Sequence, residues 1–171
     1  MTTNGTSPHM QFAYRFEATM TESIPIGITP EGVRFDNVFD GVIVEGPHTG
    51  ARVHAVDPFL LRSDGVGVID AYELISTTAG QQITARVYGY VTPPAGMQLP
   101  PPEVLLRADF QWPDIDFPLH GFVLASTGAR ELDWMNRTAF AIEGTFNMAS
   151  RRLAIVGHYR SSAPAVAAAA S

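Results

Sequence analysis

Apolar and polar residues alternate through nearly the whole chain, and this feature constrains the fold more than any other. The alternation is clearest in FAYRFEAT from residue 12, GVRFDNVFDGVIVEG from 32, VIDAYELI from 68 and ITARVYGYV from 83. A period of two is typical of strands whose two faces meet different surroundings. With further candidates near residues 51, 103, 120, 138 and 151, the pattern predicts roughly eight to ten strands.

Short segments rich in turn residues join these strands, namely GPHTG at 46–50, SDG at 63–65, TTAG at 77–80 and NMAS at 147–150. Connections this short make neighbouring strands antiparallel. The spacing suits a sandwich or a closed barrel, and we favour the barrel because closure removes the two open edges of a meander. The prediction is therefore an all-β fold, a single antiparallel β-barrel. Only residues 126–137 are expected to be helical, with Ser126 or Thr127 as N-cap.

Two proline-rich segments, 92–103 and 111–122, are expected to leave the sheet, because proline has no N–H to donate to a strand ladder. They would either cover a barrel end as a lid or pack as ordinary long connections. We assign residues 1–160 to a single β-barrel domain, since a chain of 171 residues that is 46% hydrophobic suits one core. Residues 161–171 are expected to form a flexible Ala/Ser-rich tail.

The charged residues exclude several classes of function. Seventeen acidic against eleven basic residues leave a net charge of −6, which repels nucleic acid and anionic membranes. Every basic residue is arginine and cysteine is absent, so any catalysis would be acid–base or electrostatic. No targeting pattern and no run of about 20 apolar residues is present. We expect a cytoplasmic protein with neither nucleic-acid nor membrane partners.

Common catalytic and metal-binding fingerprints are missing. The sequence has no GxSxG elbow, phosphate loop or dinucleotide fingerprint, which leaves hydrolase, kinase and dehydrogenase functions without support. His48 and His54 flank a turn near Asp57, but their spacing matches no standard set of metal ligands. We therefore expect no metal and no cofactor.

The strands at 68–75 and 83–91 carry polar and aromatic residues where aliphatic ones would serve. One face holds Val68, Asp70, Tyr72 and Leu74 with Thr84, Arg86, Tyr88 and Tyr90, and the other holds Ile69, Ala71, Glu73 and Ile75 with Ile83, Ala85 and Val87. Either the apolar set fills the barrel and the polar set is wet, or a polar and aromatic set lines a ligand cavity. A hairpin centred near Thr78 and Ala79 would bring Asp70 opposite Arg86, as a surface salt bridge or as a buried pair ready for a substrate.

The cavity interpretation leads to three hypotheses. The first is a cofactor-independent isomerase, cyclase or lyase of secondary metabolism, acting on a hydrophobic oxygenated molecule such as a polyketide-like or aromatic compound. The second is a lipocalin-like carrier or sensor that binds such a molecule unchanged. The third is a structural oligomer with a packed barrel. Apolar residues on both strand faces also favour a homodimer.

For the enzyme, each chemical role has candidate residues. Asp70 or Glu73 would accept the proton, Arg86 or Arg137 would stabilise an anion, and Tyr88 would donate a hydrogen bond. The candidate substrate-binding residues are Asp57, Tyr72, Tyr90, Trp112, His120, Trp134 and Asn136.

Several short motifs follow one another from about residue 26 to 159: PIGITPEGVRF, FDGVIVEGPHTGARV, Asp57, SDG at 63–65 and ELDWMNRTAF. Their order is similar to that of domain-of-unknown-function family 3237. The resemblance implies a small antiparallel barrel, lipocalin-like or similar to allene oxide cyclase barrels, and leaves the activity open. It marks Asp57, Asn136 and Arg137 as family features with functional groups. Asp57-Pro58 and Tyr72-Glu73 stand where the family would have Asp-Trp and Arg-Tyr, which implies a specialised pocket.

Overall fold

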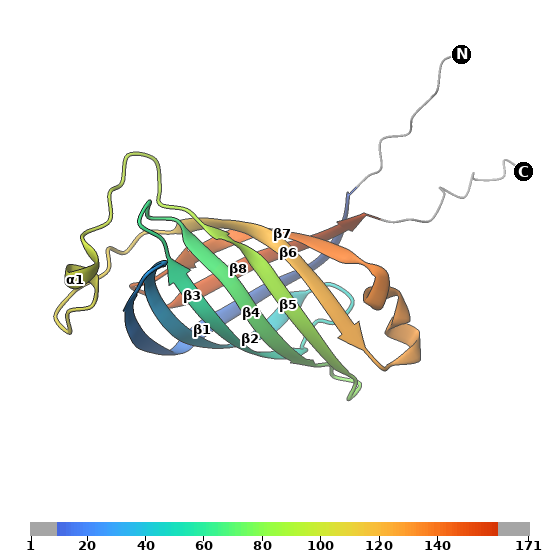
Figure 1. Ribbon diagram of the computed structural model, residues 1–171. Coiled ribbons are helices and arrows are strands. Elements are labelled where there is room, and N and C mark those ends of the chain that lie inside the picture. Colours follow the sequence, from blue (N-terminus) through green and yellow to red (C-terminus); the bar gives the residue numbers. More distant parts are fainter. Residues whose placement is uncertain (1–9, 161–171) are drawn as a thin grey trace, which may run out of the picture.

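The computed structural model describes residues 10–160, in which eight antiparallel strands close into a barrel (Figure 1). The strands are β1 (Met10–Thr29), β2 (Gly32–Glu45), β3 (Arg52–Leu61), β4 (Gly67–Ser76), β5 (Gln82–Val91), β6 (Phe117–Thr127), β7 (Ala139–Asn147) and β8 (Arg152–Arg160). Each strand pairs with the next and β8 pairs with β1. The predicted all-β antiparallel barrel is confirmed. The tail at 161–171 lies outside the described residues, and the domain limits stay a prediction.

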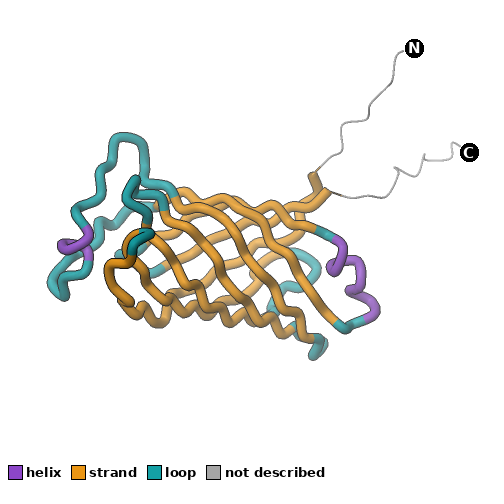
Figure 2. Tube along the Cα trace, viewed as in Figure 1, coloured by secondary structure: helices purple, strands orange, loops and turns teal. Residues whose placement is uncertain are grey.

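The connections divide between two ends of the barrel, where Figure 2 shows the helical segments. The η1 end carries the turns at 46–51 and 77–81 and the 3-10 helix η1 (Arg130–Arg137). The α1 end carries the long connection at 92–116, which includes the short helix α1 (Pro102–Leu105). No helix of residues 10–160 combines the length and the hydropathy needed to cross a membrane.

Three segments differ in the structure from their predicted secondary structure. The helix expected at 126–137 begins at Arg130, and Ser126 and Thr127 end strand β6 instead of capping it. The strand expected from residue 103 is replaced by α1 and an irregular loop, because proline suits the first turn of a helix, where no N–H is needed. The second proline-rich segment rejoins the sheet at Phe117, and the carbonyl of Pro118 accepts a hydrogen bond from the Thr92 N–H at 2.9 Å.

The apolar alternate residues fill the barrel, which decides between the two interpretations of the strand faces. On β5, Ile83, Ala85 and Val87 are at most 3% exposed, whereas Arg86 on the same strand points to solvent. The connection at 92–116 closes the α1 end, since Met97 and Leu99 pack against the core. A larger space of about 540 Å³ lies on the outer side of this connection, between it and the turns at 30–31 and 62–65.

The β4–β5 hairpin has a register two residues away from the predicted one. Tyr72 faces Arg86 and Asp70 faces Tyr88, because the chain reverses in a wider turn closed by hydrogen bonds of the Thr77 N–H to the Gln81 carbonyl and of the Gly80 N–H to the Thr77 carbonyl. Asp70 and Arg86 are consequently diagonal neighbours, with 3.7 Å between Oδ1 and Nη2 and about half of each side chain exposed. Of the two predicted roles, the structure shows the surface pair.

Candidate functional site

A cavity of about 110 Å³ opens inside the barrel at the η1 end. Its wall is almost entirely apolar and includes Phe16, Ile83, Val123 and Ile142. Smaller spaces of about 50 and 30 Å³ continue toward the α1 end, and Phe16 and Ile142 also line the first of these. A space of ~150 Å³ accommodates benzene in a protein core. The cavity therefore suits a small ring or one end of a longer apolar molecule.

Aromatic side chains surround the mouth of this cavity. The ring of Trp134 in η1 lies 5.3 Å from that of Tyr159 and 5.8 Å from that of Phe140, measured between centroids. Phe12 and His48 also line the opening. Such an amphipathic rim offers stacking to an apolar ligand and hydrogen bonds to its polar groups.

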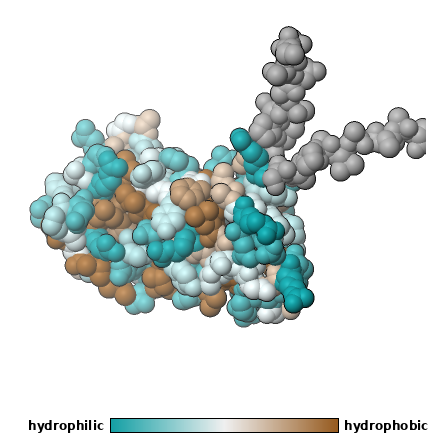
Figure 3. All heavy atoms as spheres, turned by 45° about the vertical axis from the view of Figure 1, so that its right-hand side comes forward, coloured by the Kyte–Doolittle hydropathy of each residue, from teal (hydrophilic) through white to brown (hydrophobic). Residues whose placement is uncertain are grey.

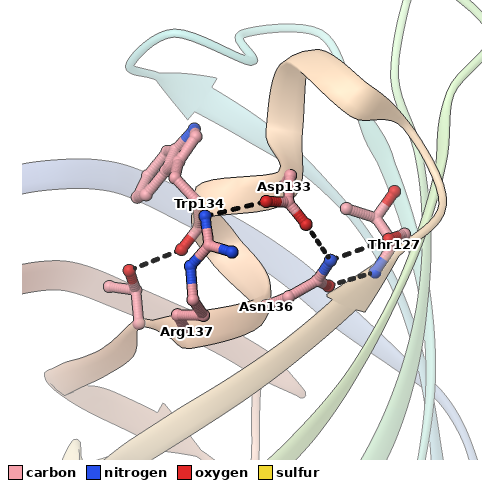
Figure 4. A network of polar contacts seen from close by, with 6 residues as sticks. Thr127, Asp133, Trp134, Asn136 and Arg137 are labelled. Atoms are coloured by element: carbon pink, nitrogen blue, oxygen red, sulfur yellow. Dashed lines mark hydrogen bonds and ion pairs between the residues drawn. The ribbon is translucent and has the colours of Figure 1, made fainter.

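Figure 4 shows the polar contacts around η1, the 3-10 helix that carries Trp134. The Asn136 amide accepts a hydrogen bond from the Thr127 N–H at 2.8 Å and donates one to the Thr127 carbonyl at 3.0 Å, which fixes η1 to the end of β6. Arg137 pairs with Asp133 at 2.7 Å on the exposed side of η1. Neither Asn136 nor Arg137 is among the residues that line the cavity, and the substrate-binding and catalytic roles predicted for them stay predictions.

Glu73 is the carboxyl group on the wall of the cavity. It points inward from β4 and stands between Ala55 of β3 and Ala85 of β5, whose small side chains leave room around it. The side chain is part-buried and faces the cavity, and within residues 10–160 its carboxyl makes no hydrogen bond or ion pair. Burial raises the pKa of Glu73 to about 7, and the nearby charge of Asp57 adds to the rise.

Tyr14 enters the same cavity through a β-bulge. Phe12 pairs with His158 and Tyr14 with Gly157, which leaves Ala13 unpaired on β1. A Cβ on Gly157 would lie 2.5 Å from Cε1 of Tyr14, so glycine makes room for the ring. Burial, and then the charge of Glu73, raise the pKa of Tyr14 above its ordinary value, and the hydroxyl keeps its proton. Sequence reasoning missed Tyr14, although FAYRF places it on the same strand face as Phe16.

Asp57 lies deeper in the barrel and is 6% exposed. The β3–β4 ladder is interrupted between Val56 and Leu60, where Pro58 has no N–H to donate, and Asp57 Oδ1 accepts the Asp70 N–H at 3.1 Å. Burial raises the pKa of Asp57 to about 7. Buried Asn37, opposite Asp57 on β2, also lines this deeper space. It was missed too, although a polar residue among Val33, Phe35 and Phe39 was a visible signal.

The other predicted site residues lie elsewhere. The outer faces of β4, β5 and β6 carry Asp70, Tyr72, Arg86, Tyr88, Tyr90 and His120. Trp112 is at the α1 end against Phe110 and Phe117. Of the predicted set, the structure brings together Glu73, Asp57 and Trp134 around the interior. The outer-face location corrects the expectation that the polar set lines the cavity, and the catalytic and binding roles given to these residues stay predictions.

Residues 10–160 contain no cluster of three or more side chains able to hold a metal ion.

Comparisons with known proteins agree with this architecture. The family described as "Protein of unknown function (DUF3237)" matches residues 8–160. No curated protein sequence matches the chain. Similar solved structures include a protein of unknown function from Clostridium acetobutylicum ATCC 824, with a TM-score of 0.73, 16% identity, and coverage of 90% of this chain and 99% of that one.

Two further structures share the fold. A β-barrel like protein from Acinetobacter baumannii AYE has a TM-score of 0.67 and 20% identity, and covers 93% of this chain and 99% of its own. An enzyme from Penicillium herquei has a TM-score of 0.56 and 19% identity, and covers 92% of this chain and 99% of its own. At such identities the likeness establishes the barrel, while function depends on the site.

Proposed function

This chain belongs to the DUF3237 family, and we propose that it is a cofactor-independent acid–base enzyme acting on a hydrophobic oxygenated small molecule held inside the barrel. The observation that supports this proposal is the unpartnered carboxyl of Glu73 in an apolar cavity. Burying a polar group without a partner costs free energy, and a barrel that needs only a filled core gains nothing from it. A group kept at such a cost is expected to serve a ligand.

Glu73 is suited to transfer protons at neutral pH, because its pKa of about 7 populates both the acid and the carboxylate. As the carboxylate it takes a proton from a carbon next to a carbonyl, and the electron pair of the broken C–H bond moves onto the carbonyl oxygen. Returning the proton to another carbon completes an isomerisation. Expulsion of a leaving group or attack on a second centre gives a lyase or a cyclase instead.

The developing oxyanion needs a hydrogen-bond donor, and Tyr14 offers one on the same cavity wall. Its raised pKa keeps the hydroxyl protonated, and a donor in an apolar site stabilises charge better than one in water. No arginine lines the cavity within residues 10–160. A neutral donor therefore takes the role that a guanidinium would otherwise fill.

Deuterium exchange tests this proposal without knowledge of the natural substrate. The full-length protein is incubated in D2O with a panel of neutral aromatic and polyketide-like ketones, and label at the carbon next to the carbonyl is followed by mass spectrometry. We expect labelling above the uncatalysed rate, abolished in Glu73→Gln and retained in Glu143→Gln, whose exposed carboxyl lies on β7. Equal labelling by Glu73→Gln would exclude Glu73 as the base.

The second candidate is a carrier, which the closed α1 end and the aromatic mouth of the cavity favour. A carrier would show saturable quenching of Trp134 fluorescence by ketones that acquire no label. Measuring quenching and labelling on the same samples separates the two functions. We further propose that the protein forms a homodimer and is located in the cytoplasm.

A further inference from the structure

The outer wall formed by β4, β5 and β6 is unusually rich in aromatic and aliphatic side chains for a surface. Its exposed apolar members, together with Val56 of the adjoining β3, are between 39% and 47% exposed: Val56, Tyr72, Leu74, Tyr90, Phe122 and Leu124. Cross-strand pairing makes them contiguous, since Tyr72 neighbours Val56 on one side and Arg86 on the other, and Arg86 neighbours Leu124. We call this surface the aromatic wall. Figure 3 shows apolar side chains gathered between polar ones along the barrel.

Two opposite charges lie within the aromatic wall. Arg86 and Asp70 are diagonal neighbours at 3.7 Å, with the guanidinium 6.0 Å from the centre of the Tyr88 ring. Oδ1 of Asp70 is shielded from solvent, yet within residues 10–160 it accepts no hydrogen bond. About half of each of these two side chains is exposed, so each can form a charge-assisted contact with an opposite charge on a second molecule.

The opposite wall has a different character. Around β1, β2 and β8 the outer face carries more charged side chains: Arg15 pairs with Glu45, Asp40 pairs with His54 of β3, and Glu17 and Arg152 lie near Asp40. The exposed apolar residues there are aliphatic and not aromatic, namely Ile24, Ile26, Ile28, Val42 and Val44. With a net charge of −6, two copies repel each other through most of their surface. The aromatic wall, where one positive and one negative side chain balance, is a face on which two copies can meet.

We propose that the aromatic wall is the interface of a homodimer with twofold symmetry. A twofold axis between Arg86 and Asp70 brings Arg86 of each copy to the partner subunit's Asp70, because symmetric contacts pair residue i with j and j with i. The two aromatic surfaces then cover each other. Tyrosine, phenylalanine and arginine are enriched in the buried centres of such interfaces. This proposal also explains why tyrosines interrupt the aliphatic pattern of β4 and β5.

Sedimentation velocity of the full-length protein tests the interface, at concentrations up to about 100 µM, because dimer populations depend on concentration. We expect wild type to sediment as a dimer. Arg86→Glu places like charges together and is expected to shift the protein to monomer. The double variant Asp70→Arg/Arg86→Glu reverses both charges, and we expect it to recover the dimer. A wild-type monomer throughout the concentration range would overturn the proposal.

A matched pair of apolar substitutions locates the interface. Leu124→Asp lies in the aromatic wall and is expected to give a monomer, whereas Ile26→Asp on β1 replaces a similarly exposed apolar residue outside it and is expected to remain a dimer. Circular dichroism confirms that each variant keeps its strands. Dissociation by Ile26→Asp with a dimer retained by Leu124→Asp would place the interface elsewhere and overturn the proposal. None of these substitutions touches the cavity, so the result is independent of the proposed chemistry.

Discussion

Single residues inside this barrel show how burial changes the pKa of a carboxyl group. Glu73 and Asp57 are both carboxyl groups with a pKa of about 7, for the same main reason, desolvation. They differ in their partners. Asp57 accepts the Asp70 amide hydrogen and completes an interrupted ladder, which is a structural task. Glu73 has no such task among the described residues, and because of this contrast we propose Glu73, and not Asp57, as the proton acceptor.

The raised pKa of Glu73 makes stability depend on pH. A carboxyl with a pKa near 4.5 in the unfolded chain and about 7 in the fold binds its proton more tightly when folded, so the free energy of unfolding falls as pH rises between these values. We expect Glu73→Gln to be more stable than wild type by about 3 kcal/mol at pH 8 and equal to it near pH 4. Urea denaturation at both pH values measures the difference, and a gap independent of pH would contradict the assigned pKa.

At the scale of elements, the two ends of the barrel differ in how they are covered. The long connection packs the α1 end, whereas η1 borders the open mouth with Trp134 and is tied down by Asn136. Between the ends, the wall needs glycine where strands approach closely. Gly89 and Gly121 face each other on β5 and β6, and a Cβ on Gly121 would lie 2.2 Å from the Tyr88 carbonyl oxygen.

The anchoring of η1 can be tested by comparing two neighbouring residues. Asn136→Ala removes both hydrogen bonds to the Thr127 backbone, and we expect it to cost about 1 kcal/mol and to shift Trp134 fluorescence. Arg137→Ala removes an exposed ion pair and should cost less than about 0.5 kcal/mol. Chemical denaturation followed by circular dichroism supplies the free energies. Equal losses would show that the amide does not anchor η1.

The close approach of β5 and β6 predicts a strong effect of a single methyl group. Gly121→Ala forces the Cβ against backbone atoms that have no freedom to move aside, and we expect a loss of about 2–4 kcal/mol in the free energy of unfolding. Gly128→Ala is the control, because a Cβ there meets nothing within 4 Å. Thermal unfolding of both variants measures the contrast, and a stable Gly121→Ala protein would mean that the strands can separate.

At the scale of the whole molecule, charge and shape together select ligands. The chain is acidic overall, the cavity carries a carboxyl and no arginine within the described residues, and the mouth is aromatic. An anionic ligand is repelled both by the surrounding field and inside the barrel. A neutral apolar molecule meets no such barrier.

The preference for neutral over anionic ligands can be measured with two probes that share a naphthalene ring and differ in charge. We expect 2-naphthol to quench Trp134 with at least about tenfold higher affinity than 2-naphthoate at pH 8, since about 1.4 kcal/mol of repulsion corresponds to a factor of ten. Glu73→Gln should narrow this preference, because it removes one of the repelling charges. Equal affinities for the two probes in wild type would contradict an anion-excluding interior.

The sequence by itself determined the barrel. Period-two alternation and short turns require antiparallel strands, and closure removes their edges. The same pattern made Glu73 a candidate, and the family resemblance made Asp57 one. The register of the β4–β5 hairpin was out of its reach, because Thr77 and Gly80 set the turn through hydrogen bonds that no propensity specifies.

Only the tertiary structure decided which strand face points inward. On β5 one face is apolar and the other is polar and aromatic, whereas on β4 both faces mix the two kinds. Alternation alone therefore left open whether the apolar set fills the barrel or the polar and aromatic set lines a cavity. Barrel closure made the choice, because the narrow interior accepts Ala71, Ala85 and Gly89 and leaves Tyr72 and Tyr88 to the outside. The bulge that brings Tyr14 beside Glu73 likewise exists only once β8 pairs with β1.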